Sequence, residues 1–357
     1  MRRDYSEGMP DVGRRISGSL KYFRKKMATA GIAMALLGQA ITGTGQHQNA
    51  LTFEPEASLN KNKYIVLIAG DEAYRSEESM PMLAKILAAR HGFRTTVLFS
   101  INPATGFVDP DEHQYMRGME QLEKADLVIL ATRFREYPDD QMAYFDQYLQ
   151  AGKPIIGIRT ATHAFRYAKR PDSRYARYGF TSTRKGWENG FGKKILGETW
   201  VSHHGANGKE GTRALIDGTK QQKGHPVLKG IKEIWGITDV YGIKNLPADA
   251  EILLWGQPVD GMTRESAPVW GKTMMPLAWT REYTADSGKK GKAFVTTMGA
   301  SMDFLNEDLR RLLVNACYWA VGSESSLPEN ADVAIVGEYA PTMFGFGTYQ
   351  KEKKVAE

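Results

Sequence analysis

Short apolar runs, separated by segments of helical or loop character, follow one another over residues 64–158 of this chain. Each run is five or six residues long and almost entirely apolar, as in strands that are buried on both faces. The runs are residues 64–69, 95–99, 127–131 and 154–158. Strands that alternate with crossover segments form a parallel sheet that helices cover on both faces. The sequence therefore predicts an α/β fold with a doubly wound, mainly parallel sheet.

Two crossover segments have the pattern of helices. The first begins near Ser79, a helix-capping residue, and ends at Gly92, and the second runs from Asp139 to Gln150. A last helix starts near Asn306, and its apolar stripe includes the single cysteine, Cys317, which is expected in the core. Later apolar runs predict strands at residues 237–241, 251–255, 276–279 and 293–297.

These patterns divide the chain into four parts. They predict a secretory signal region at residues 1–40, a linker at 41–62, an α/β domain at 63–322 and a C-terminal tail at 323–357, packed as an arm. Residues 165–200 interrupt the alternation and are rich in Arg, Tyr, Ser and Gly. Loops of this length are usually functional or disordered, so this stretch is expected to form an insertion over the sheet.

The first 40 residues have the features of a secretory signal in their usual order. A cationic patch at residues 21–26 precedes a short apolar stretch, and Gly38-Gln-Ala40 offers a small-residue cleavage site. We therefore expect export to the periplasm or the extracellular space. Arg14-Arg15 leaves the Sec and twin-arginine routes open, and a basic tail before a membrane-surface helix is the alternative. The chain has no run of roughly 18 apolar residues, so no stable membrane span is expected after signal removal.

The positive charge of the chain is concentrated at its beginning. The formal net charge is +6, but residues 1–50 hold eight Lys and Arg against three Asp and Glu. The remainder is close to neutral, so the charge does not argue for a nucleic-acid partner. The expected partner is a small-molecule carbohydrate, for the reasons below, and a homo-oligomer is left open.

The loop after the first apolar run argues against a nucleotide cofactor. It contains neither G-x-G-x-x-G nor G-x-x-x-x-G-K-[ST], the two glycine patterns that cradle phosphates. It also carries four carboxylates, which would repel a pyrophosphate: Asp71, Glu72, Glu77 and Glu78.

Polar residues follow the ends of several predicted strands. In an open parallel sheet, ligands bind at the carboxyl ends of the strands, so these residues are the candidates for a site. The candidate catalytic residues are Asp71, Glu72, His163, His203, His204 and Asp239. The candidate substrate-binding residues are Arg75, Arg133, Arg159 and Thr160.

The histidines among these candidates admit three interpretations. Imidazole suits general acid–base work, and it also binds a divalent metal such as zinc. The third interpretation is a hydrogen-bonded structural histidine. The chain has no H-E-x-x-H spacing, so neither the presence of a metal nor its identity follows from the pattern.

The turn Gly157-Ile-Arg-Thr-Ala161 lies where some α/β enzymes place a nucleophile. In class I glutamine amidotransferases, the corresponding turn reads roughly Gly-Ile-Cys-x-Gly. Here Arg159 stands in place of the cysteine, and a guanidinium stays protonated and cannot attack a carbonyl. We therefore expect no glutaminase activity, although the fold can be shared.

Several segments, taken in order, resemble the ThuA-like (trehalose-utilisation) family over about residues 60–322. The segments are Tyr64–Glu78, Gly157–Phe165, Ser202–Gly205, Gly224–Gly230, Asp239–Tyr241, Phe294–Ser301 and Leu309–Gly322. The resemblance implies a class I glutamine amidotransferase-like, flavodoxin-type fold without glutaminase activity, and a link to carbohydrate metabolism. Many relatives carry histidine where this chain has Arg159 and Ala300, which weakens any metal or acid–base role carried over to these two positions.

Three functions are compatible with these residues. The first is an exported enzyme that acts on a sugar or an oxidised (keto) sugar through histidine and carboxylate groups, because such a pair can abstract a proton next to a carbonyl. The second is a non-catalytic sugar-binding or assembly module. The third is a metal-dependent hydrolase.

Overall fold

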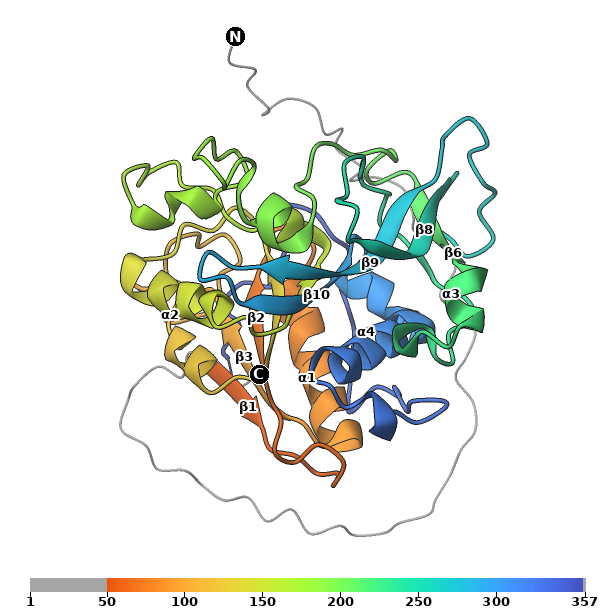
Figure 1. The fold of residues 1–357 in the computed structure, drawn as a ribbon, viewed down its shortest axis with the longest axis horizontal. Coiled ribbons are helices and arrows are strands. Elements are labelled where there is room, and N and C mark those ends of the chain that lie inside the picture. The colour runs from red at the N-terminus through yellow and green to blue at the C-terminus, as the bar shows by residue number, and fades with distance from the viewer. Residues whose placement is uncertain (1–49, 356–357) are drawn as a thin grey trace. The chain divides into compact units, whose positions relative to one another are not determined.

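The computed structural model describes residues 50–355, and ten strands of this part form one sheet (Figure 1). The strands are β1 (Ala50–Phe53), β2 (Tyr64–Gly70), β3 (Arg94–Phe99), β4 (Leu127–Thr132), β5 (Ile155–Ile158), β6 (Gly211–Ile216), β7 (Trp235–Gly236), β8 (Glu251–Val259), β9 (Met275–Thr284) and β10 (Lys290–Thr296). Their order across the sheet is β1-β3-β2-β4-β5-β10-β9-β8-β6-β7.

Half of the sheet is parallel. Strands β3, β2, β4, β5 and β10 run in parallel, which confirms the predicted doubly wound α/β core. Beyond β10, the strands β9, β8, β6 and β7 pair antiparallel, and β1 pairs antiparallel at the opposite edge. Short connections permit antiparallel pairing, whereas parallel neighbours need a crossover of a dozen residues or more.

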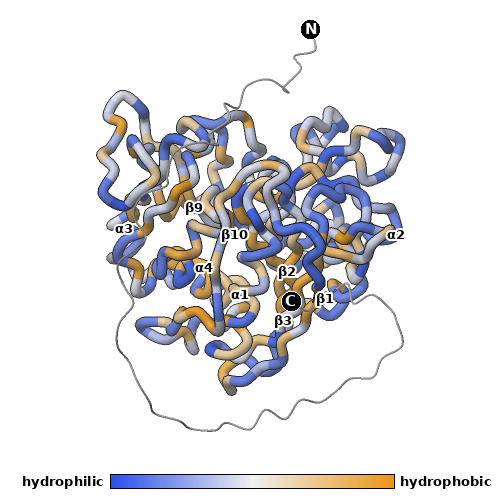
Figure 2. Tube along the Cα trace, turned by 180° about the vertical axis from the view of Figure 1, so that it is seen from behind, coloured by the Kyte–Doolittle hydropathy of each residue, from blue (hydrophilic) through white to orange (hydrophobic). Residues whose placement is uncertain are grey.

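Helices cover both faces of the parallel part. The α-helices of the described residues are α1 (Ser76–His91), α2 (Asp139–Gln150), α3 (Gly218–Gln222) and α4 (Glu307–Ala320), and α1, α2 and α4 provide this cover. Side chains of α1 and α4 share one apolar core with alternate residues of β2, such as Ile65 and Leu67. Side chains of α2 share a second core with Val66 and Ile68, on the other face. Figure 2 shows the apolar character of the strands that lie between these layers.

Short helical turns connect these elements. They are η1 (Met119–Glu123), η2 (Arg159–His163), η3 (Arg174–Tyr178), η4 (Gly192–Leu196), η5 (Pro226–Leu228), η6 (Ser301–Leu305) and η7 (Glu324–Ser326). Of these, η4 is a π-helical turn and the others are 3₁₀ helices. Turn η2 follows β5 directly, and η6 follows β10 after four residues, so both begin at the carboxyl-end edge of the parallel strands.

Three local predictions differ from the structure. Helix α1 begins at Ser76, three residues before the expected capping Ser79, because Arg75 takes a left-handed conformation and starts the helix. Residues 237–241, predicted as a strand, form only an isolated pairing of Tyr241 with His203 after the two-residue β7. Residues 50–53, within the expected linker, form β1 and pair with β3. The predicted signal region lies outside the described residues.

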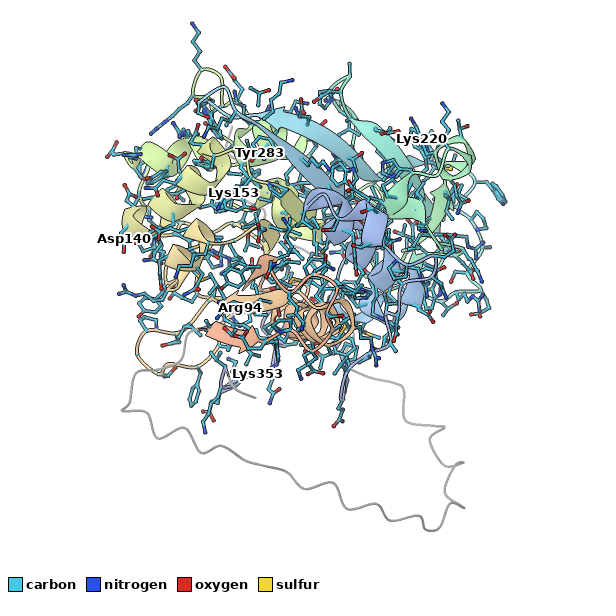
Figure 3. The ribbon with its side chains drawn as sticks, turned by 60° about the horizontal axis from the view of Figure 1, so that its bottom comes forward. Arg94, Asp140, Lys153, Lys220, Tyr283 and Lys353 are labelled. Atoms are coloured by element: carbon cyan, nitrogen blue, oxygen red, sulfur yellow. The ribbon has the colours of Figure 1, made fainter. Side chains whose placement is uncertain are left out.

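The insertion and the tail both pack on the sheet layers. In residues 165–200, Tyr178, Trp187 and Phe191 belong to the core on the α2 face. The tail contributes Leu327 and Val333 to the core on the α1 and α4 face. It then reaches the loop after β3, where the Val108 amide donates to the Lys353 carbonyl at 2.8 Å. Figure 3 shows Lys353 at this end of the chain. Among residues 50–355, no helix is long and apolar enough to cross a membrane.

Gly299, just after β10, provides a test of the packing at the carboxyl-end edge. Its φ of +139° disfavours any residue with a Cβ, and an added Cβ would lie 2.2 Å from Cγ2 of Ile158. We expect Gly299→Ala to lower the free energy of unfolding by about 2 kcal/mol or more, measured by urea denaturation. Gly271→Ala is the control, because an added Cβ there meets nothing within 4 Å. Equal stability of the two variants would contradict the described geometry.

Candidate functional site

Loops from the ends of β2 and β5 are joined by a short hydrogen bond. The Thr160 hydroxyl donates to Oδ2 of Asp71 at 2.5 Å. The other oxygen of Asp71 accepts from the amides of Ala73 and Tyr74 at 2.8 and 3.0 Å. Burial and the nearby charge of Glu72 raise the pKa of Asp71. Two of the predicted site residues, Asp71 and Thr160, are therefore brought together.

Arg159 lies at the centre of the site. Its Nη2 donates to Oδ1 of Asp239 at 2.8 Å, and its Nη1 donates to the carbonyls of Asp239 and Thr297 at 2.7 Å each. The guanidinium carbon lies 4.5 Å from the ring centre of Tyr74 and 3.9 Å from that of Tyr241. We expected Arg159 to bind substrate oxygens, but its side chain is buried and its terminal nitrogens are bonded to protein acceptors. In this structure, Arg159 positions Asp239.

The backbone at this edge is strained. Arg75, Phe134 and Arg159 have φ of 61°, 54° and 48°, a left-handed conformation that costs a non-glycine residue about 1–3 kcal/mol. Each of the three lies in the loop or turn that follows a parallel strand: β2, β4 and β5 respectively. Strained backbone of this kind gathers at functional sites, because the surrounding structure must hold it in place.

His203 and Asp239 form a histidine–carboxylate pair. Nδ1 of His203 lies 2.6 Å from Oδ2 of Asp239. The carboxylate is completely buried, whereas the imidazole is 34% exposed. Because Nδ1 faces a carboxylate, the neutral imidazole carries its proton on Nδ1, and Nε2 is then the nitrogen with the lone pair. We name Asp71, Thr160, Arg159, Asp239 and His203 the strand-end cluster.

His163 is a buried histidine near this cluster, and its imidazole is neutral. Its Nδ1 is 3.2 Å from the Thr162 hydroxyl, and its ring packs near Phe134 and Trp200 at centroid distances of 5.2 and 5.1 Å. Burial, together with the positive charges of Arg133 and Arg159, holds the pKa of His163 well below its usual value. A charge on this imidazole is therefore strongly disfavoured at neutral pH.

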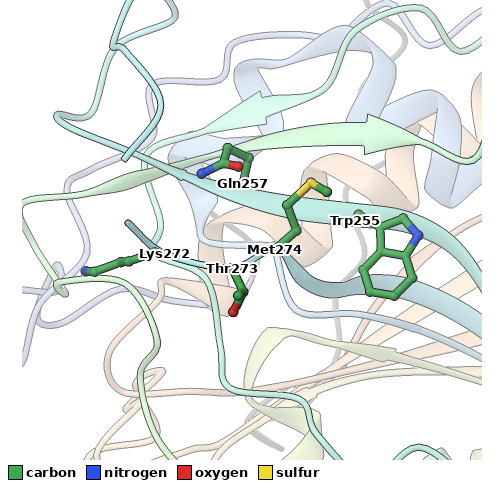
Figure 4. Close-up of a pocket in the computed structure, with 5 residues that line it drawn as sticks. All are labelled: Trp255, Gln257, Lys272, Thr273 and Met274. Atoms are coloured by element: carbon green, nitrogen blue, oxygen red, sulfur yellow. The ribbon is translucent and has the colours of Figure 1, made fainter. Parts of the chain in front are cut away.

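His204 points to a different part of the surface from its neighbour His203. Its Nε2 lies 2.7 Å from the Thr273 carbonyl oxygen, so it donates there. Thr273 lines a hollow of about 470 Å³ together with Trp255, Gln257, Lys272 and Met274 (Figure 4). Both histidines were candidate catalytic residues, and only His203 belongs to the strand-end cluster.

Glu72 is held between two arginines. Its Oε2 accepts from Arg135 at 2.7 Å, and its Oε1 pairs with Arg133. His113 lies 4.0 Å from the same carboxylate, and burial and the two arginines lower the pKa of His113 to about 4. Glu72 therefore forms ion pairs with both arginines, and of the two only Arg133 is partly exposed, at 21%, at the rim of the site.

Arg75 stabilises the loop that carries the carboxylates. It is fully buried, and its guanidinium donates to the carbonyls of Glu72 and Ala73 at 3.2 and 3.3 Å. It also pairs with the Thr348 hydroxyl of the tail. We expected Arg75 to bind substrate oxygens, and the structure instead gives its hydrogen bonds to the protein.

The described residues do not gather a metal-binding set. Within residues 50–355, no three or more His, Cys, Asp and Glu side chains are grouped so that they could hold a metal ion. In the strand-end cluster, both oxygens of Asp239 are already bonded to Arg159 and His203. These residues do not fit the alternative of a divalent metal, and we derive no step through one.

Some residues of the site escaped the sequence analysis. Tyr74 and Tyr241, which enclose Arg159, lie in segments that were singled out, but their aromatic rings gave no indication of that role. Trp200, which is not among the candidate residues either, packs against His203 at a centroid distance of 5.7 Å. The contacts of the tail with this edge join residues more than 200 positions apart, so no local pattern could have predicted them.

Glu77, in the first turn of α1, provides a test of a buried carboxyl group near the site. Burial raises the pKa of its carboxyl to about 8, so the native protein keeps a proton that the unfolded chain loses above about 4.5. Stability should therefore fall as the pH rises from about 4.5 to about 8, and level off beyond. We expect Glu77→Gln to remove this fall and to stabilise the protein at pH 7 by at least about 1 kcal/mol.

Urea unfolding at pH 5, 6, 7 and 8 measures this difference. The control is Glu265→Gln, which changes an exposed carboxylate and should leave the pH dependence as it is. If Glu77→Gln kept the slope of the unsubstituted protein, Glu77 would not hold a proton in the native state.

Comparisons with known proteins give one family and several similar structures. The model of the ThuA family, described as trehalose utilisation, matches residues 65–320. Among solved structures, a ThuA-like protein from Parabacteroides merdae is 17% identical, with 73% of this chain and 90% of that chain covered and a TM-score of 0.47. A ThuA-like protein from Bacteroides uniformis is 16% identical, with 76% and 96% covered and a TM-score of 0.45.

A third similar structure is the glutaminase domain of Trypanosoma brucei CTPS with bound acivicin. It is 11% identical, with 76% of this chain and 98% of that chain covered and a TM-score of 0.36. No curated protein matches the chain. Because the family model covers well over half of the sequence, the chain belongs to the ThuA family of trehalose utilisation.

Proposed function

We propose that this protein acts on a sugar or an oxidised (keto) sugar by acid–base chemistry, with His203 as the group that moves the proton. The observation that carries the proposal is the 2.6 Å contact between Nδ1 of His203 and the buried carboxylate of Asp239. Asp239 is fixed in turn by Arg159 at 2.8 Å. A histidine oriented in this way is a general base whose tautomer is set by its partner.

The imidazole would work through its free nitrogen. With the proton on Nδ1, Nε2 accepts a proton from the carbon next to the sugar ketone, and the electron pair of that bond moves toward the ketone oxygen. The resulting imidazolium is stabilised by the Asp239 carboxylate, as in other histidine–carboxylate pairs. Nε2 then returns the proton to the former ketone carbon, while the proton of the neighbouring hydroxyl passes to the former ketone oxygen. The ketone has then moved by one carbon, and His203 is restored. These proton transfers use only groups of the protein and of the substrate.

An oxidised sugar suits this site better than an ordinary one. A hydrogen next to a ketone is far more acidic than the C–H hydrogens of an unoxidised sugar, so a single histidine is a strong enough base for it. Arg133, exposed in part at the rim, can donate to substrate oxygens. Asp71 and Thr160 act indirectly in this scheme, because they join the loop after β2 to the turn that holds Arg159.

The same turn supports the proposal that the protein has no glutaminase activity. Arg159 occupies the strained position that follows β5, with φ of 48°. A guanidinium remains protonated and offers no nucleophile at the place where an amidotransferase needs a thiol. Cys317, the single cysteine, lies in α4 and is buried in the core.

The adjacent histidines allow a matched test of the catalytic proposal. We expect His203→Gln to lower the kcat for an oxidised disaccharide by about 10²–10⁴-fold, and His204→Gln to change it by less than about twofold. Both side chains are at least partly accessible, so neither substitution should unfold the protein. Asp239→Ala is a poorer probe, because it would leave the buried guanidinium of Arg159 without its ion pair.

The assay compares oxidised and unoxidised disaccharides, with substrate consumption and the melting temperature as readouts. Full activity of His203→Gln would refute the assigned base. Stabilisation by a sugar without turnover in the unsubstituted protein would instead support the alternative of a non-catalytic sugar-binding or assembly module.

We further propose that the chain is exported. The support is the cationic and apolar order of residues 1–40, which lie outside the described structure. A C-terminally tagged full-length chain should be recovered, shortened at its N-terminus, from the periplasm or the medium of a bacterial host. Removal of residues 21–40 should retain it in the cell, and recovery of an unshortened chain in the cytoplasmic fraction would contradict the proposal.

A further inference from the structure

The C-terminal tail crosses the loop that carries Asp71 and Glu72. We call residues 342–349 the tail strap. The Gly345 amide donates to the Ala73 carbonyl at 2.8 Å, and the Thr342 amide donates to Oε2 of Glu78 at 2.8 Å. On the other side, the Ser301 hydroxyl donates to the Thr342 carbonyl at 3.0 Å. The strap is therefore hydrogen-bonded to the loops after both β2 and β10.

Side-chain contacts with buried residues of the domain hold the strap in addition to these hydrogen bonds. Phe344 covers a small apolar cluster of Ala73, Tyr74 and Ala300, and its ring centre lies 5.4 Å from that of Tyr74. The Tyr74 hydroxyl in turn accepts from Arg159 at 3.1 Å. The strap also gives the fully buried guanidinium of Arg75 one hydrogen-bond acceptor, the Thr348 hydroxyl. It is therefore part of the wall around the strand-end cluster.

One side chain of the strap faces outward at the rim. Phe346 is 48% exposed, and the guanidinium carbon of Arg133 lies 5.0 Å from its ring centre. On its other side, Arg133 lies 4.2 Å from the ring centre of Phe134. An accessible aromatic face is thus held beside a guanidinium that retains some exposure. The charge of Arg133 also acts on His163, behind the cluster.

This pairing suits a neutral, polyhydroxylated ring. The C–H face of a sugar packs on an aromatic ring, while the guanidinium donates to ring hydroxyls. An anionic ligand is less well suited, because Arg133 is already ion-paired with Glu72 and the Asp71 carboxyl lies in the same loop. The exposed ring and the existing ion pair of Arg133 therefore favour an uncharged sugar at the strap.

We infer that Phe346 is a specificity-determining residue, which packs against an uncharged sugar ring bound at Arg133. The inference rests on the proposed function, because it assigns part of the substrate's contact surface to the same site. The family match ends at residue 320, so the strap lies outside the matched segment. The tail would thus determine which sugar this chain accepts, whereas the matched segment supplies the acid–base pair.

Substitutions within the strap test this inference in the full-length protein. We expect Phe346→Ala to raise the KM for the sugar that the protein turns over by about tenfold, with kcat changed less than about twofold. Phe346→Tyr keeps the ring and should stay within about twofold of the unsubstituted protein. Met343→Ala is the matched control, because Met343 is similarly exposed in the same strap, at 43%.

The outcomes separate this inference from the proposed function. If the unsubstituted protein turns over the sugar and Phe346→Ala leaves KM unchanged, the role of Phe346 is refuted and the acid–base proposal stands. Binding without turnover that weakens in Phe346→Ala supports the strap and refutes the catalytic proposal. If no disaccharide of the panel is bound or consumed, both are refuted. A melting temperature within about 2 °C of the unsubstituted protein shows that a variant is folded.

Discussion

The ion pair between Arg159 and Asp239 is the interaction on which the arrangement of the site depends. Both groups are buried, and removal of either partner from such a pair typically costs about 3–5 kcal/mol, because the other charge is left unpaired. Tyr74 and Tyr241 hold the guanidinium from two sides, and two carbonyls accept its remaining Nη1 hydrogens. With Arg159 held in this way, Asp239 can present its second oxygen to His203 in a fixed direction.

The strained turn after β5 has a clear function in this arrangement. In a left-handed conformation, Arg159 leaves the strand abruptly, and its side chain crosses from the parallel half of the sheet to residue 239. The arginine is drawn into the protein by Asp239 and the two tyrosines, so the strained turn holds a buried support for another residue.

The sequence predicted the parallel core well and the site in part. Continuous apolar runs such as residues 64–69 and 127–131 define buried strands, because each face must meet a helix layer, and the carboxyl ends of these strands then lie at one edge. This geometry correctly gathers Asp71, Thr160 and Arg159. The sequence could not show which of His203 and His204 belongs to the site. Their directions depend on the backbone pairing of residues 202–205 with 240–242. It also could not reveal contacts of the tail, which depend on tertiary packing.

The site is assembled from both halves of the sheet, and this has a consequence for its stability. Asp71 and Arg159 follow parallel strands, whereas His203 and Asp239 lie in the segments that flank the antiparallel strands β6 and β7. The His203–Asp239 pair reaches the parallel half mainly through Arg159, whose Nη1 also bonds the carbonyl of Thr297 after β10. The acid–base pair is therefore correctly placed only when the two halves are joined through β10 and β9. Local opening of the antiparallel half would separate His203 from Asp71 without unfolding the parallel core, so order in that half is a condition for the chemistry proposed here.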